Sequence, residues 1–190
     1  MAITTSAPGA AALSAGFLAA FAQTVGIEGG FTADRQDKGN WTGGKVGVGE
    51  LRGTKYGISA ASYPTVDIRN LSLDAARAIY LRDFWTPIGG DALPLPLAFL
   101  AFDAAANNGA GTAGRWVQQA AGVAADGKVG PVTLRAIAAA AAGPAGLTAL
   151  CIEFQARRIN AMAVLPTWKR YGLGWARRLC TTLSNTPKPP

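Results

Sequence analysis

The first regular hydrophobic pattern in the chain runs from Leu13 to Glu28. Its larger apolar residues include Phe17, Phe21 and Val25, which have the i, i+4 spacing of a helix with one buried face. Glu28 follows Val25 by three residues and continues the same stripe. The pattern therefore predicts a helix over residues 13–28 that carries a carboxyl group beside the core at its C-terminal end.

Residues 29–57 lose this period and are rich in glycine. Glycine clusters with scattered aromatic residues are typical of turns rather than of helices. We expect a turn-rich segment with a short β-hairpin around Val46–Lys55, closed by the Gly-Ile-Ser of residues 57–59. Such a segment is well placed to form a substrate-facing loop.

Helical patterns return after Ser72, which has a side chain suited to an N-cap. We predict helices over residues 72–86, 96–108, 112–121, 131–142 and 145–163, and a last helix after Pro166. In that last helix the stripe of Trp168, Tyr171 and Trp175 is interpreted as core, with a sugar-binding platform as the alternative. The predicted fold class is mainly α, of the α+β type, with a helical-bundle lobe and a small β-hairpin near the N-terminal third.

The composition excludes several kinds of active site. The chain contains no histidine, which removes Ser-His-Asp and Cys-His nucleophilic sites and imidazole metal ligands. The two cysteines, Cys151 and Cys180, are far apart and each lies in an apolar helical pattern. Buried free thiols are the favoured interpretation, and a single disulfide is the alternative.

The net charge of +7 is concentrated at one end of the chain. The last acidic residue is Glu153, and only Lys and Arg follow it among the charged residues. A basic C-terminal helix favours anionic partners such as cell-wall polymers or a membrane surface, and a merely solvated helix face is the alternative. No recognisable nucleic-acid-binding motif accompanies the charge, so we predict no nucleic-acid partner.

The N-terminal residues show no secretory signal. No Lys or Arg precedes the apolar stretch that begins near Ala10, so the positive region of a signal peptide is missing. Residues 10–27 contain polar residues and glycines and are at the short end for crossing a bilayer. We expect an amphipathic, partly buried helix there.

The candidate chemistry lies in residues 27–39. Glycosidic bond cleavage needs a proton donor that stays protonated near neutral pH and a second group that orients water. Glu28, beside Ile27 and the apolar stripe, would be partly desolvated, which raises the pKa of a carboxyl group. Asp34 and Asp37 stand in a polar loop beside Arg35 and Lys38 and should stay ionised. Glu28 is therefore the candidate acid and the aspartates are the candidate bases.

Each of these residues also has a structural interpretation. Glu28 before two glycines could be a surface residue at a helix C-cap, and the aspartates could be ordinary turn residues. Calcium is a weaker alternative, because the loop lacks the ligand spacing of an EF-hand. We predict no metal and no cofactor. Thr54 and Tyr56 could face Glu28 and hold water or a sugar hydroxyl.

The motifs carry a family resemblance. Glu-Gly-Gly-Phe at residues 28–31, Asp-x-x-Asp-x-Gly at 34–39 and Thr-Lys-Tyr-Gly-Ile-Ser at 54–59 resemble the signature of glycoside hydrolase family 108, the lysozyme-like N-acetylmuramidases of phages and bacterial secretion systems. The stretches at 102–109, 116–122 and 126–134 resemble the helical peptidoglycan-binding half that accompanies it. The resemblance covers roughly residues 10–180.

The resemblance implies a lysozyme-like fold and a division of the chain into two packed parts. These are a catalytic part over residues 10–95 and a peptidoglycan-binding lobe over 96–183, with a flexible tail at 184–190. It implies cleavage of the β-1,4 bond between N-acetylmuramic acid and N-acetylglucosamine, with Glu28 as the catalytic glutamate. Asp37 and Thr54 are carried over as the pair that positions water. Asp103 and Asn107 would line the opposite wall of the cleft, with a buried or helix-capping role as the alternative.

The sequence departs from the family pattern between Asn40 and Arg52, where about ten extra residues stand. They include Trp41 and Glu50, which could lengthen the hairpin and alter sugar contacts or enter the site directly. The insertion leaves the position of Thr54 open.

The leading hypothesis is an inverting muramidase of the phage endolysin type. It would act as a monomer on periplasmic peptidoglycan after release from the host cytoplasm. The alternatives are a lytic transglycosylase and a peptidoglycan-binding module without activity.

Overall fold

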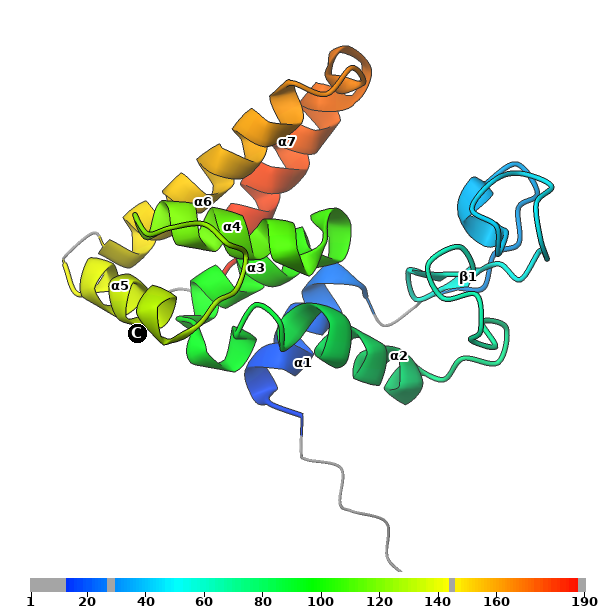
Figure 1. Cartoon of the computed structure of the whole chain (residues 1–190), viewed down its shortest axis with the longest axis horizontal. Coiled ribbons are helices and arrows are strands. Elements are labelled where there is room, and N and C mark those ends of the chain that lie inside the picture. The colour runs from blue at the N-terminus through cyan, green and yellow to red at the C-terminus, as the bar shows by residue number, and fades with distance from the viewer. Residues whose placement is uncertain (1–12, 27–29, 144–145, 188–190) are drawn as a thin grey trace, which may run out of the picture.

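The computed structural model of this chain describes residues 13–26, 30–143 and 146–187. Within them the chain forms seven α-helices and one small antiparallel sheet, which confirms the predicted α+β fold class (Figure 1). The helices are α1 (Ala15–Thr24), α2 (Leu73–Tyr80), α3 (Leu95–Asn108), α4 (Ala110–Ala120), α5 (Pro131–Ala141), α6 (Gly146–Ala163) and α7 (Trp168–Ser184). The strands are β1 (Thr54–Lys55) and β2 (Ile58–Ser59), and short helical segments occupy Lys38–Asn40, Leu81–Trp85 and Gly90–Ala92.

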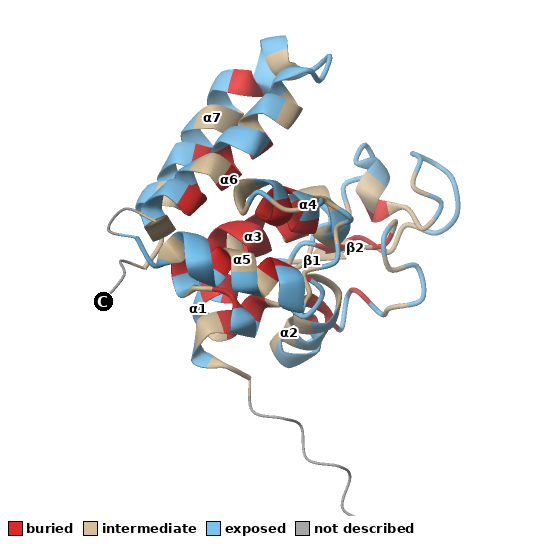
Figure 2. Ribbon diagram, turned by 60° about the vertical axis from the view of Figure 1, so that its left-hand side comes forward, coloured by how far each residue is buried: buried red, intermediate tan, exposed pale blue. Residues whose placement is uncertain are grey.

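Helix α3 is the centre of the fold. Every residue from Pro96 to Ala105 is buried, because the sequence of this helix is apolar on all sides and a helix of that kind needs neighbours around its whole circumference. It contacts α1, α4 and α6, and Figure 2 shows the buried residues concentrated along it and on the faces that neighbouring helices turn toward it.

An aromatic cluster joins α1 and α2 to α3. The rings of Phe17, Tyr80, Trp85 and Phe102 meet edge to face, with centroids 5.6–6.0 Å apart, and Phe21 meets Tyr80 at 5.3 Å. Each such pair contributes about 0.5–1.5 kcal/mol beyond the area it buries. The predicted inward face of the first helix, with Phe17 and Phe21, is confirmed.

Helix α1 is shorter than predicted. It starts after Ser14, whose side chain accepts a hydrogen bond from the Phe17 amide, and it ends at Thr24. Gly26 has a φ of +79°, a left-handed conformation in which glycine often ends helices. The prediction that this helix continues past Thr24 was therefore wrong, because the backbone leaves the helix at Gly26. Ile27 and Glu28 lie outside the described residues.

The β-hairpin also lies further along the chain than predicted. Strands β1 and β2 pair Thr54 with Ser59 and Lys55 with Ile58, so the hairpin spans residues 54–59 rather than 46–55. Tyr56 and Gly57 form its turn with φ values of +51° and +74°, the conformation of two-residue hairpin turns. The turn-rich segment predicted over residues 29–57 is confirmed for its described residues, 30–57. Residues 30–63 are called the loop lobe below.

Helices α6 and α7 form a hairpin that projects from the helical body (Figure 1). Leu179 is buried, but Tyr171 is 45% exposed, and Trp168 and Trp175 are only half-buried. The interpretation of the aromatic stripe as core was thus wrong for Tyr171, because the outer part of the hairpin has no third helix to cover it. None of the helices in the described ranges is long and apolar enough to cross a bilayer.

The other helix starts agree with the sequence pattern. Ser72 caps α2 by accepting a hydrogen bond from the Ala75 amide, and Pro131 is the first residue of α5, where its missing N–H costs nothing. The predicted division of the chain between residues 95 and 96 stays a prediction. It falls at the start of α3, which contacts α1 on one side and α4 and α6 on the other.

Candidate active site

Glu28, the predicted catalytic acid, lies outside the described residues, so its predicted desolvation stays a prediction. The structure fixes the chain on either side of it. Before it, the C-terminal turn of α1 closes with a 2.9 Å hydrogen bond from the Val25 amide to the Phe21 carbonyl. After it, Thr32 forms an antiparallel bridge with Thr54, with N···O distances of 2.8 and 2.9 Å. The hairpin thus lies beside the chain four residues after Glu28.

Gly53 makes this bridge possible. Its φ is +84°, and a Cβ built on it would lie 2.4 Å from the Thr32 carbonyl oxygen and 2.6 Å from the Phe31 ring. Only glycine fits where two segments of backbone approach so closely. The position of Thr54 beside Thr32 therefore depends on the absence of a side chain at residue 53.

Asn40 ties the aspartate loop to the hairpin. Its side chain is fully buried. Its Nδ2 donates to the Asp34 carbonyl at 3.0 Å, and its Oδ1 accepts the Thr54 hydroxyl at 2.7 Å. Its own carbonyl accepts the amides of Arg52 and Gly53. One buried amide thus connects both predicted water-positioning segments.

Asp34 and Asp37 are exposed and shape their own turns. Asp34 accepts the Gln36 amide at 2.9 Å, and Asp37 accepts the Gly39 amide at 2.8 Å as the N-cap of the short helix 38–40. Each of these bonds uses one lone-pair direction of the carboxylate and leaves others directed at solvent. The structure therefore brings both aspartates together on one exposed loop next to Thr54.

The insertion Asn40–Arg52 folds back on itself. Trp41 bridges Leu51, and the Thr42 amide donates to the Glu50 carbonyl at 3.0 Å. The two ends of the insertion therefore lie side by side. The insertion does not prevent Thr54 from pairing with Thr32. The indole of Trp41 donates to the Arg35 carbonyl at 3.0 Å, so this residue braces the aspartate loop.

Two further candidates have contacts of their own. The Glu50 carboxylate is 69% exposed and pairs with Arg52 at 2.7 Å. Tyr56 lies at the turn of the hairpin, and its carbonyl accepts the Tyr80 hydroxyl at 3.1 Å. That bond anchors the hairpin to α2. Their predicted contacts with substrate stay predictions.

Asp103 is buried between helices. Its carboxylate is 3% exposed and accepts Nη1 of Arg158 at one oxygen and Nη2 of Arg178 at the other, both at 2.6 Å. Asn107, one turn further along α3, donates to the Asp103 carbonyl at 2.7 Å and accepts Nη1 of Arg178 at 3.1 Å. Desolvation lowers the pKa of the buried Arg158 guanidinium. This is the buried polar arrangement that the sequence left open for Asp103.

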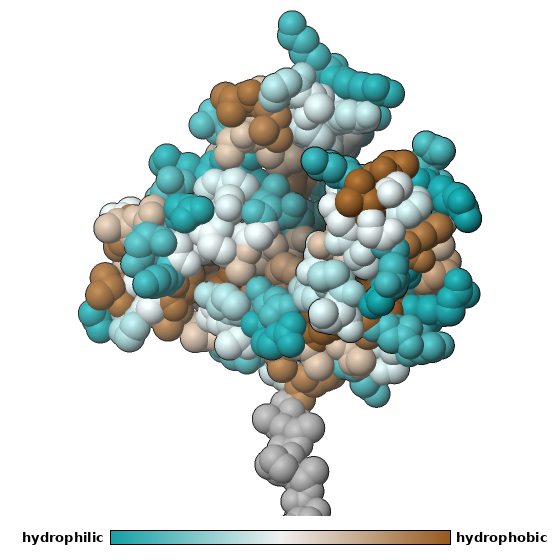
Figure 3. Space-filling view, turned by 45° about the vertical axis from the view of Figure 1, so that its right-hand side comes forward, coloured by the Kyte–Doolittle hydropathy of each residue, from teal (hydrophilic) through white to brown (hydrophobic). Residues whose placement is uncertain are grey.

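A polar groove runs between the C-terminal end of α1 and α7. Gln23 and Thr24 line it on one side, and Arg178, Thr181 and Thr182 line it on the other. The space-filling view shows the surface hollowed between the loop lobe and the α6–α7 hairpin (Figure 3). The C-terminal end of α1, at Gln23 and Thr24, therefore borders a concave part of the surface.

Sequence reasoning missed three residues that organise this region: Asn40, Arg158 and Arg178. Asn40 looked like one more polar residue of a glycine-rich loop, and no periodicity distinguishes a buried amide there. The two arginines belong to a basic run, for which the sequence predicts contacts with anionic partners or a solvated helix face. One sequence signal could have indicated their burial. Arg158 lies one helical turn after Phe154, and Arg178 directly precedes Leu179, and both of these apolar residues are buried.

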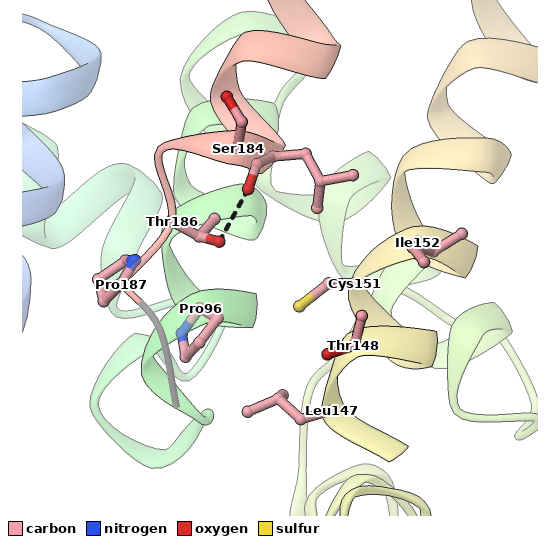
Figure 4. A pocket seen from close by; sticks show the side chains of 9 residues that line it. Pro96, Leu147, Thr148, Cys151, Ile152, Ser184, Thr186 and Pro187 are labelled. Atoms are coloured by element: carbon pink, nitrogen blue, oxygen red, sulfur yellow. Dashed lines mark hydrogen bonds between the residues drawn. The ribbon is translucent and has the colours of Figure 1, made fainter. Parts of the chain in front are cut away.

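Both cysteines are free thiols, but only one is buried. Cys151 directs its sulfur into an apolar pocket between α6, the start of α3 and the C-terminal end of α7 (Figure 4). Burial raises the pKa of its thiol to about 11. Cys180 is exposed on α7, so the expectation that it would be buried was wrong. Within the described ranges, no three His, Cys, Asp or Glu side chains lie close enough together to hold a metal ion.

The helical body with a small antiparallel sheet defines a lysozyme-like α+β protein, and comparison with known proteins identifies its family. Residues 21–109 match the family Glycosyl hydrolase 108, and residues 112–180 match the family described as a predicted peptidoglycan domain. The chain therefore combines a region similar to glycosyl hydrolase family 108, residues 21–109, with a region similar to a peptidoglycan domain, residues 112–180. It is a glycoside hydrolase of peptidoglycan.

A solved structure supports the same fold. The structure of Brucella abortus SagA is similar to this chain with a TM-score of 0.69 and 26% sequence identity, over 88% of this chain and 91% of that chain. No curated protein matches the sequence. The two family matches meet at residues 109–112, between α3 and the body of α4.

Proposed function

We propose that the protein is an N-acetylmuramidase that cleaves the β-1,4 bond between N-acetylmuramic acid and N-acetylglucosamine. Glu28 would protonate the leaving oxygen, and Asp34 or Asp37 would activate water for an inverting displacement. The observation that carries this proposal is the anchoring of the aspartate loop. Asn40 holds that loop to Thr54, and Thr54 bridges the chain just after Glu28.

Acid and base can work together only if the distance between them is held, since small displacements cost large factors in rate. Inverting glycosidases keep their two carboxyl groups roughly 6.5–9.5 Å apart so that a water molecule fits between base and sugar. The exposed aspartates keep lone pairs directed at solvent, which favours a role in activating water. Thr54 donates its hydroxyl proton to Asn40, so its oxygen remains an acceptor for that water.

The test is Glu28→Gln, assayed for release of soluble fragments from purified peptidoglycan sacculi. We expect activity to fall by at least about a hundredfold, since a positioned general acid contributes about 10²–10⁴ in rate. The thermal melt should stay within about 2 °C, corresponding to about 0.5–1 kcal/mol for a chain of this length. Glu153→Gln is the matched control, because Glu153 is a partly exposed residue of α6 that pairs with Arg157. Wild-type activity in the Glu28 variant would refute the proposal.

Product analysis separates the muramidase from a lytic transglycosylase that uses the same glutamate. A muramidase leaves a reducing N-acetylmuramic acid end, whereas a transglycosylase leaves a 1,6-anhydro end that is lighter by one water. Mass spectrometry of the fragments decides between them. An inverting enzyme also releases the α-anomer first, which NMR can follow during the reaction.

The site of action is part of the same proposal. We propose that the protein serves as an endolysin that reaches periplasmic peptidoglycan from the host cytoplasm, and that it acts as a monomer. The basic α7, with Lys169, Arg170 and Arg177 exposed, would assist by contacting anionic polymers of the wall or the membrane surface. Turbidity of expressing cells should fall only after the inner membrane is permeabilised, and earlier lysis would contradict this route.

A further inference from the structure

A second groove lies on the other side of Arg178, enclosed by α3, α6 and α7. It has a volume of about 210 Å³ and is lined by Asn107, Asn108, Arg158, Met162, Trp175 and Arg178, with Leu165 and Leu179. Four of these residues carry planar polar groups and are called the polar wall below: Asn107, Asn108, Arg158 and Arg178. The apolar lining residues, Met162, Leu165, Trp175 and Leu179, are called the apolar wall. Small-molecule sites commonly combine an apolar lining with a few convergent polar groups.

The polar wall carries an excess positive charge. Among the described residues, Asp103 is the only carboxylate in contact with Arg158 or Arg178. Two guanidinium groups thus share one carboxylate, and Arg158 is buried with only 2% of its side chain exposed. Burial lowers the pKa of the Arg158 guanidinium, and the neighbouring charge of Arg178 lowers it further. A second anion beside them would balance the charge of this cluster.

Hydrogen-bond donors remain available at the groove. Arg178 donates Nη1 to Asn107 and Nη2 to Asp103, and its side chain is still 49% exposed. A guanidinium carries five N–H groups, so three remain. Asn108 accepts Nε of Arg158 through its Oδ1, which turns its amide N–H₂ away from that bond. A guanidinium presents the fork of donors that a carboxylate accepts best, and Asn108 lies in the same lining.

The apolar wall is built around Trp175. Its ring stacks on Tyr171 at an angle of 30° with centroids 5.9 Å apart, and Trp168 lies 6.1 Å away on a tilted plane. These neighbours fix the orientation of the half-buried indole that lines the groove. An alkyl group attached to the bound anion would lie against it.

We propose that this groove binds a free carboxylate of the peptidoglycan stem peptide, with the adjoining alkyl side chain against Trp175. The proposal rests on peptidoglycan being the partner. The lactyl carboxyl of N-acetylmuramic acid is consumed in the amide bond to the stem peptide, so the free carboxylates of the polymer belong to its peptides. In this proposal the groove binds the stem peptide, while the loop lobe acts on the glycan strand.

The experiment measures binding of synthetic stem peptide to the full chain by calorimetry. This peptide has no glycosidic bond, so the result does not depend on whether the protein is a muramidase. Three ligands are compared: the free acid, the same peptide with all carboxyl groups amidated, and peptide-free glycan chains. We expect the free acid to bind at least about tenfold more tightly than the amide, as loss of a charge-assisted hydrogen bond predicts.

Arg178→Gln should lower the affinity for the free acid about tenfold or more, whereas Arg177→Gln should leave it within twofold. Both variants remove one charge from adjacent positions of α7, and Arg177 is exposed. Equal affinity for acid and amide in the wild-type protein would overturn the proposal even if the Arg178 variant failed to fold. If both variants lost the same affinity for the free acid, the effect would come from net charge alone, and the proposed site would be refuted. Displacement of the peptide by an equal concentration of inorganic phosphate would make the groove a general anion site and would also refute it.

Discussion

The two cysteines have the same side chain and opposite surroundings. Cys151 is 4% exposed and faces the apolar pocket that Pro96 and Leu147 line, whereas Cys180 lies on the solvent side of α7. The thiolate is the reactive form of cysteine, and desolvation disfavours that charged form. Burial therefore protects Cys151 twice, by blocking access and by raising the pKa of its thiol to about 11.

We predict that a maleimide reagent at pH 7.5 labels one thiol of the folded protein quickly and the second only after denaturation. Cys180→Ser should abolish the fast phase, and Cys151→Ser should leave it unchanged. Because the folded-state pKa of Cys151 is raised, the stability it contributes is present at neutral pH and declines as the pH rises from about 9 toward 11. Two fast labels in native protein, counted by mass spectrometry, would contradict the buried position of Cys151.

At the scale of elements, the starts of helices were predictable, whereas the end of α1 and the position of the hairpin were not. Capping and proline signals at Ser72 and Pro131 act within one turn, so the sequence alone places the starts of α2 and α5. The end of α1 depends instead on the left-handed Gly26, and a hydrophobic stripe carries no information about where the backbone turns. The hairpin shifted for a similar reason, since its position follows from the turn at Tyr56 and Gly57.

The candidate site divides in the same way. Residue types and spacing suggested Glu28, Asp34, Asp37 and Thr54, because the chemistry of glycoside cleavage restricts which side chains can serve. The connection between them passes through Asn40, which is 14 residues from Thr54 in sequence and is bonded to it. No local pattern encodes a contact of that kind, since it depends on the closure of the whole insertion.

Asn40→Ala tests whether this amide organises the loop lobe. Removing it leaves the Asp34 carbonyl and the Thr54 hydroxyl without their partner, and a buried unsatisfied group costs about 1–3 kcal/mol. We expect faster proteolysis within residues 34–53 and a loss of activity on sacculi larger than the loss of global stability. Asn70→Ala is the control, because Asn70 makes a similar bond to Asp67 on the exposed surface. Equal effects of the two variants would show that Asn40 has no organising role.

At the scale of the whole molecule, one buried carboxylate joins three helices. Asp103 on α3 accepts hydrogen bonds from Arg158 on α6 and Arg178 on α7, and so connects the region matched to the hydrolase family with the region matched to the peptidoglycan domain. The geometry couples the two parts through charge as well as through packing. The orientation of the α6–α7 hairpin relative to the C-terminal end of α1 therefore depends on Asp103.

Asp103→Asn keeps the shape of the side chain and removes its charge. Arg158 would then be a buried cation without a counterion, and breaking a buried pair in this way costs about 3–5 kcal/mol, a large fraction of the stability of an ordinary domain. We expect a correspondingly lower midpoint in urea denaturation. Glu153→Gln, which breaks the partly exposed pair with Arg157, should cost less than about 1 kcal/mol. The double variant Asp103→Asn with Arg158→Met should be more stable than Asp103→Asn alone, because it removes the stranded charge. If Asp103→Asn instead left the denaturation curve unchanged and abolished cleavage, Asp103 would have to be a substrate-contacting residue.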